Sequence, residues 1–185
     1  MRRTLDLLYR ATLWASALCL LTIALMVGAQ LGGRLIDGAM KLVGLEPIGI
    51  VILSLAEICS YLLGAASFLG LAGTLKAGAH IRVTMALNAL TKPVRRYVEL
   101  WAFGFAALGS AYMTYQLGHF AWVSFLFNEV SPGVIRVPLA YPQGAMALGA
   151  AVLTVALIDE CVAVWRSGRP TFRATEDAVT LGKEG

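Results

Sequence analysis

Hydrophobic residues fill four long stretches of the chain, and short charged segments separate these stretches. The first stretch, residues 11–33, has no charged side chain. As a helix that rises 1.5 Å per residue it is about 34 Å long, which suffices to cross a hydrocarbon core of about 30 Å. Three further stretches lie at about residues 47–75, 97–127 and 137–158. We predict an all-α integral membrane protein with four transmembrane helices at these positions, in a single domain over residues 1–165.

The composition agrees with a chain surrounded by lipid. Only 14% of the 185 residues are charged, whereas soluble domains contain about 25%. The first apolar stretch is longer than the roughly 7–15 residues of a signal-peptide core, so we expect it to remain as a span. The formal net charge of +4 does not indicate nucleic-acid binding. The basic residues lie at the ends of the apolar stretches, where they meet phospholipid headgroups.

The distribution of basic residues predicts the orientation. Four spans put both chain ends and the middle loop on the same side of the membrane. Of the 15 basic residues in the chain, the opposite side carries only Arg34, Lys41 and Arg136. Cytoplasmic loops are enriched in Lys and Arg. We therefore expect both termini to be cytoplasmic, with residues 166–185 forming a flexible tail.

The loops also show patterns of their own. Between the second and third spans, apolar residues recur at helical spacing beside basic residues, which predicts a short amphipathic helix in the membrane interface. The residues that define this interfacial helix are Val83, Leu87, Leu90, Arg95 and Arg96. Pro93 is expected to mark the turn into the third span. Residues 131–144 contain three prolines and are expected to form an ordered connection without helix.

Glu57 is the one acidic residue well inside an apolar stretch. A charge at that depth is costly, so we expect the side chain to face protein, to pair with a donor or to be protonated. One interpretation is structural, either a hydrogen bond to Tyr61 one helical turn further on or a contact with a partner subunit. The other interpretation is a relay for protons or ions.

Enzymatic chemistry has no support in the sequence. There is no nucleophile–base pair, phosphate-binding loop or cluster of metal ligands, and the three cysteines form no CxxC motif. His119 has no second histidine at similar depth for haem ligation, so we expect it to pack in the interface. Asp159 and Glu160 are expected to form a solvated end to the fourth span. We therefore expect neither an enzyme nor a cofactor.

Two segments resemble a known family. The first runs from Glu57 to Val83, and the second from Val137 to Gly144. They resemble the DctQ-type small membrane subunit of tripartite ATP-independent periplasmic (TRAP) transporters. The matching positions are Glu57, Tyr61, Gly70, His80, Ile81, Arg82, Val83, Pro138 and Gly144. Where the family often has an arginine shortly after the acid, this chain has Cys59 and Ser60, which argues against a Glu–Arg pair within this helix.

The resemblance implies a role in transport. A periplasmic binding protein would deliver an organic acid, and a large membrane subunit would carry the substrate and sodium sites. This chain would support the large subunit as its one-to-one partner in a bacterial inner membrane. The symport activity would belong to the whole transporter complex. The alternative function is that of an autonomous homo-oligomeric transporter that uses Glu57 as its proton site.

Overall fold

The structure is a computed structural model that describes residues 2–49, 51–77 and 91–167. Within these ranges the fold is all-helical, with α1 (Arg2–Leu42), α2 (Leu55–Lys76), α4 (Lys92–Leu126) and α5 (Ala140–Ser167). The described residues form no strand, apart from an isolated bridge between Val130 and Pro138. The predicted all-α class is therefore confirmed for the described part of the chain.

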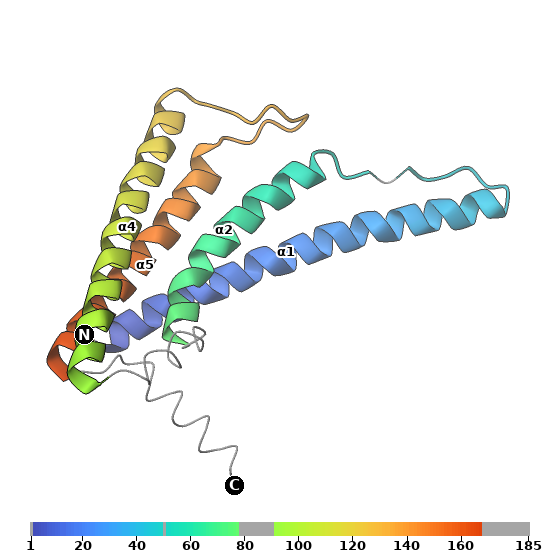
Figure 1. Ribbon diagram of the computed structural model, residues 1–185. Coiled ribbons are helices and arrows are strands. Elements are labelled where there is room, and N and C mark those ends of the chain that lie inside the picture. Colours follow the sequence, from blue (N-terminus) through green and yellow to red (C-terminus); the bar gives the residue numbers. More distant parts are fainter. Residues whose placement is uncertain (1, 50, 78–90, 168–185) are drawn as a thin grey trace, which may run out of the picture.

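The four helices spread like a fan from the end that carries the N-terminus (Figure 1). α4 packs against α5, α5 against α2, and α2 against α1. At the narrow end of the fan, which we call the convergent end, the first turns of α1 and α4 meet the last turns of α2 and α5. The main apolar core lies near this end and consists of Tyr9, Ala72, Leu75, Val152, Ala156 and Leu157. We call the opposite end the open end, because α1 diverges from the other helices there.

Three of these helices are long and apolar enough to cross a membrane, namely Thr4–Leu42, Leu55–Lys76 and Ala140–Arg166. α4 has the length, at 35 residues, but is not among the three. Its sequence is rich in tyrosine, tryptophan, glycine and hydroxyl side chains, and its first two turns carry four charged residues. The predicted span at 97–127 thus corresponds to a helix whose composition does not by itself identify it as transmembrane.

α1 continues well past the predicted end of the first span at residue 33. It has 41 residues and is therefore about 61 Å long. The charges at Arg34, Asp37 and Lys41 end the apolar stretch without ending the helix. The helix stops where Gly44 adopts a positive φ of 78° and the Leu45 N–H donates to the Met40 carbonyl at 2.9 Å. This is a Schellman arrangement, which glycine favours.

Two other predicted boundaries differ from the structure. The second stretch begins at residue 47, but α2 begins only at Leu55, because the residues before it turn through positive φ at Gly49 and Ser54. Residues 131–144 were expected to contain no helix, but α5 begins at Ala140 and includes Pro142. Proline is tolerated in the first turn of a helix, where the backbone N–H has no partner within the helix.

Part of the predicted interfacial helix cannot be compared with the structure. Val83, Leu87 and Leu90 lie outside the described residues. Arg95 and Arg96 are instead part of α4, which starts at Lys92. Pro93 lies in the first turn of this helix, in agreement with the expectation that it marks the turn into the third span.

Candidate functional site

Polar side chains join the helices at both ends of the fan, and those at the convergent end form ion pairs. Lys76 in the last turn of α2 donates hydrogen bonds to Asp159 Oδ2 at 2.6 Å and to Glu160 Oε1 at 2.7 Å, both on α5. Its Nζ also lies 5.4 Å from the centroid of the Tyr9 ring on α1, a cation–π distance. One ammonium group on α2 therefore contacts two other helices, α5 and α1.

The expected solvated end to the fourth span is wrong. The Glu160 side chain has no exposed surface, and α5 continues beyond it to Ser167. A buried carboxylate is costly unless a partner compensates its charge. Lys76, which comes from a different part of the sequence, supplies such a partner because α2 packs against α5.

Two arginines near the start of α4 form polar contacts at the convergent end. Arg95 Nε donates to Glu99 Oε1 at 3.1 Å, one turn further along the same helix, and Glu99 is only 3% exposed. The Arg96 guanidinium donates to the backbone carbonyl of Trp165, near the end of α5. Arg96 therefore links α4 to α5, whereas the Arg95–Glu99 pair lies within α4.

At the open end, Glu57 lies where α2 begins. The Tyr61 hydroxyl donates to Glu57 Oε1 at 3.0 Å, so the hydrogen bond expected one turn along the helix is present. Gly133, from the connection between α4 and α5, backs directly against the Glu57 carboxylate, and a Cβ at position 133 would overlap it. The Ile135 N–H donates to Ser54 Oγ at 3.1 Å. The start of α2 therefore holds the α4–α5 connection in place.

The connection itself is ordered by hydrogen bonds between its two arms. The Ser131 N–H donates to the Val137 carbonyl at 2.9 Å, and the Leu139 N–H donates to the Glu129 carbonyl at 3.0 Å. Glu129 is held in turn by the Ser124 hydroxyl at 2.6 Å. Pro138 takes part in the isolated bridge with Val130. An ordered connection was expected here, and the structure has one up to the start of α5.

Glycines and hydroxyls mediate the helix contacts between the two ends. Gly149 of α5 lies so close to α2 that a Cβ would be 2.5 Å from the backbone carbon of Phe68. Gly70 of α2 faces α1, where Ser16 donates to the Ala66 carbonyl at 2.7 Å. Gly144, in contrast, has no neighbour within 4 Å of its hypothetical Cβ.

α4 and α5 share a hydroxyl cluster. Ser110 of α4 lies 2.9 Å from the hydroxyl of Thr154 on α5, and Thr114 lies 3.3 Å from the same atom. Thr154 also donates to the Ala150 carbonyl of its own helix at 2.9 Å. Polar residues of this kind join helices in an apolar environment.

The sequence-predicted residues thus fall into four groups. Glu57, Tyr61 and Pro138 lie together at the open end, where Glu57 and Tyr61 bond to each other. Gly70 lies in the α1–α2 contact, and Gly144 stands apart. His80 and Arg82 lie outside the described residues.

Three residues that join the helices were not predicted to do so from the sequence, namely Lys76, Glu160 and Gly133. Opposite charges at the same predicted end of two spans were a usable signal for Lys76 and Glu160. Gly133 offered no signal, because its role depends on the position of Glu57.

Comparisons with known proteins give the family. A family model described as "Tripartite ATP-independent periplasmic transporters, DctQ component" matches residues 48–167. This range covers well over half of the chain and includes α2, α4 and α5. Searches of curated proteins and of solved structures returned no match. The matched family is a transporter component and not an enzyme. The chain belongs to the DctQ family of small membrane components of tripartite ATP-independent periplasmic transporters.

Proposed function

We propose that this protein supports the large permease subunit of a TRAP transporter during sodium-coupled import of an organic acid. A periplasmic binding protein delivers the acid, and the two membrane subunits form a one-to-one complex in a bacterial inner membrane. The family match over residues 48–167 is the observation that carries this proposal. The small subunit itself acts as a static brace, against which the moving parts of the large subunit work.

The contacts between the helices support a static role. Ion pairs join α2 to α5 at the convergent end, and Glu57 at the open end contacts both its own helix and the α4–α5 connection. Because these polar contacts lie at both ends of α2, they oppose movement of the helices relative to one another. The Glu57 carboxylate is already bonded to Tyr61, which favours the structural interpretation of this acid over a relay.

We further propose that α4 also crosses the membrane, as the third of four spans, and that the convergent end faces the cytoplasm. Its 35 residues are enough to cross the bilayer, and its antiparallel packing against α5 requires the two helices to share the same depth. Basic residues at the convergent end include Arg10, Lys76, Arg95, Arg96 and Arg166. Their enrichment on one side supports a cytoplasmic position for this end and for both termini.

The test is co-expression of the tagged chain with the large TRAP membrane subunit of the same organism. We expect the two proteins to co-purify in equal amounts from mild detergent, and uptake of the organic acid to require both chains and a sodium gradient. The competing proposal is an autonomous transporter that uses Glu57. It predicts that the chain purifies alone as a homo-oligomer and moves a substrate in liposomes driven by a proton gradient.

A further inference from the structure

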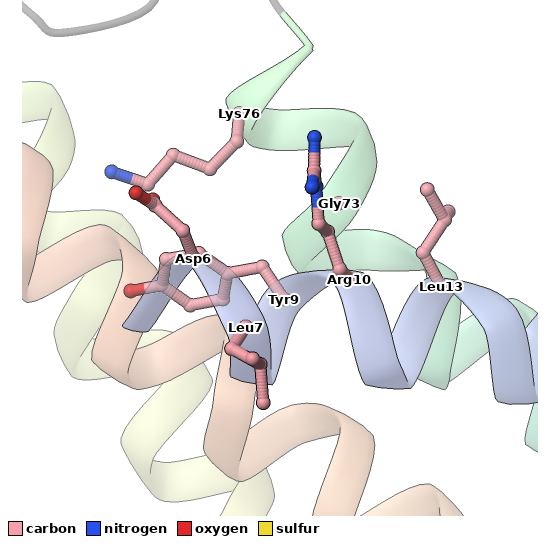
Figure 2. A pocket seen from close by; sticks show the side chains of 7 residues that line it. All are labelled: Asp6, Leu7, Tyr9, Arg10, Leu13, Gly73 and Lys76. Atoms are coloured by element: carbon pink, nitrogen blue, oxygen red, sulfur yellow. The ribbon is translucent and has the colours of Figure 1, made fainter. Parts of the chain in front are cut away.

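A pocket of about 710 Å³ lies between the first turns of α1 and the last turn of α2, at the convergent end (Figure 2). Its polar lining comes from Asp6, Tyr9, Arg10 and Lys76, and the exposed side chains of Leu7 and Leu13 provide apolar walls. Charged groups beside exposed apolar walls, at the end of a membrane-crossing helix, match the region where lipid headgroups meet acyl chains.

Two charged groups of opposite sign in this pocket form no ion pair with any residue that the structure describes. Asp6 and Arg10 take part in none of the ion pairs that the described residues form. Figure 2 shows Arg10 extending on one side of the pocket, while Asp6 and Lys76 point toward the other side. Lys76 is already bound to Asp159 and Glu160. Arg10 is therefore the cation, and Asp6 the anion, that remain for a ligand.

A third polar group in the pocket is buried. Tyr9 is only 4% exposed, yet its hydroxyl has no hydrogen-bond partner among the described residues. Buried hydroxyl groups normally find a partner, but this one has almost no accessible surface and points away from Arg10, toward α5 (Figure 2). A ligand in the pocket would therefore meet the exposed side chains of Asp6 and Arg10 and not the Tyr9 hydroxyl.

We propose that this pocket binds the headgroup of a zwitterionic phospholipid of the ethanolamine class. The Arg10 guanidinium donates hydrogen bonds to the phosphate, and the Asp6 carboxylate accepts them from the ammonium group. The acyl chains then lie against Leu7 and Leu13. One cation and one anion fit a zwitterion better than a purely anionic headgroup, which would face Asp6. The proposal goes beyond the role in transport and requires only that the convergent end lie at the membrane surface.

The test uses the purified full-length chain and native mass spectrometry. Dioleoyl phosphatidylethanolamine and dioleoyl phosphatidylglycerol are added in equal amounts, and the bound lipid is counted for the wild type, Arg10→Gln and Asp6→Asn. Arg166→Gln is the matched control, because it removes an exposed arginine at the same end but outside the pocket. Circular dichroism and size-exclusion chromatography verify that each variant is folded.

We expect the wild type to favour the ethanolamine lipid. Arg10→Gln should lower binding of both lipids about fivefold, the effect of one basic residue beside a phosphate headgroup. Asp6→Asn should remove the preference for ethanolamine over glycerol while total binding persists. Equal binding by wild type, Arg10→Gln and Arg166→Gln would overturn the proposal. Displacement of the lipid by excess inorganic phosphate would also overturn it, because the site would then recognise free phosphate and not a lipid.

Discussion

Lys76 of α2 and Glu160 of α5 lie 2.7 Å apart, although 84 positions separate them in the sequence. The carboxylate is fully buried, and the ammonium group also contacts Asp159 and the Tyr9 ring. Three of the four described helices therefore meet at a single charged group. The last turn of α2 is held in place by charge as well as by apolar packing.

Replacing Lys76 with methionine should destabilise the protein strongly. The substitution keeps the apolar stem but removes the positive charge beside a fully buried carboxylate, and breaking such a pair costs about 3–5 kcal/mol. We expect a large fall in the thermal midpoint of the chain in detergent, measured by loss of the monodisperse peak in size-exclusion chromatography.

The control for Lys76 is Lys41→Met, which removes an exposed lysine from the last turn of α1. That variant should unfold at the wild-type temperature. Adding Glu160→Gln to Lys76→Met should recover part of the lost stability, because the buried charge disappears as well. If Lys76→Met is as stable as Lys41→Met, the ion pair contributes nothing to folding.

Gly149→Ala should push α2 and α5 apart. The added Cβ would lie 2.5 Å from the Phe68 backbone carbon, and backbone atoms of a packed helix cannot move aside as a flexible side chain can. Overpacking of this kind costs about 1–3 kcal/mol. Gly144→Ala on the same helix is the matched control, since nothing lies within 4 Å of its added Cβ. Thermal unfolding should separate the two variants, and equal midpoints would contradict the close contact.

Thr154→Val tests the hydroxyl cluster between α4 and α5. Valine has nearly the same shape as threonine but cannot bond to Ser110 or to the Ala150 carbonyl. Hydrogen bonds between membrane helices contribute about 0.6 kcal/mol on average, so a small but measurable loss of stability is expected. Ser67→Ala is the comparison, because the hydrogen bond of the exposed Ser67 among the described residues lies within its own helix, to the Leu63 carbonyl. An effect no larger than that of Ser67→Ala would exclude a role for the cluster in joining the helices.

The helices could be predicted from the sequence, but their ends could not. Long apolar stretches predict helices in lipid because only intrahelical hydrogen bonds satisfy the backbone there. Charge, however, marks where the apolar environment ends and not where the helix ends. α1 continues beyond Arg34 and Asp37 and ends just before Gly44, whereas α2 begins only after Ser54. In both cases local backbone conformation, not hydropathy, determines the boundary.

The candidate site could be predicted only where its partners are close in sequence. Tyr61 lies one helical turn from Glu57, so periodicity alone places their side chains together. Gly133 reaches the same carboxylate from a different connection, and Glu160 reaches Lys76 from a different helix. Contacts of this kind depend on which faces of two helices pack together. The hydrophobic pattern of a membrane helix says little about which of its faces contacts another helix.

Gly133→Ala should displace the α4–α5 connection from the start of α2. Its Cβ would overlap the Glu57 carboxylate, so either the loop or the side chain must move. We expect faster proteolysis within residues 131–138 and a lower thermal midpoint. The double variant Gly133→Ala with Glu57→Ala removes the overlap and should restore wild-type protection of the loop. If the double variant is cleaved as fast as Gly133→Ala alone, the overlap with Glu57 is not the cause.

Glu57→Gln tests whether the Glu57 carboxylate has a structural role or couples transport to an ion. The amide oxygen of glutamine can still accept the hydrogen bond from Tyr61, while the charge and the titratable proton are lost. If Glu57 has a structural role, Glu57→Gln should leave complex yield and sodium-driven uptake close to wild type. Glu57→Leu cannot accept the hydrogen bond from Tyr61 and should lower the yield. Uptake by the co-expressed complex, normalised to the amount assembled, is the measurement. Normal assembly with abolished uptake in Glu57→Gln would assign this carboxylate to coupling, because the missing charge would then be the only defect.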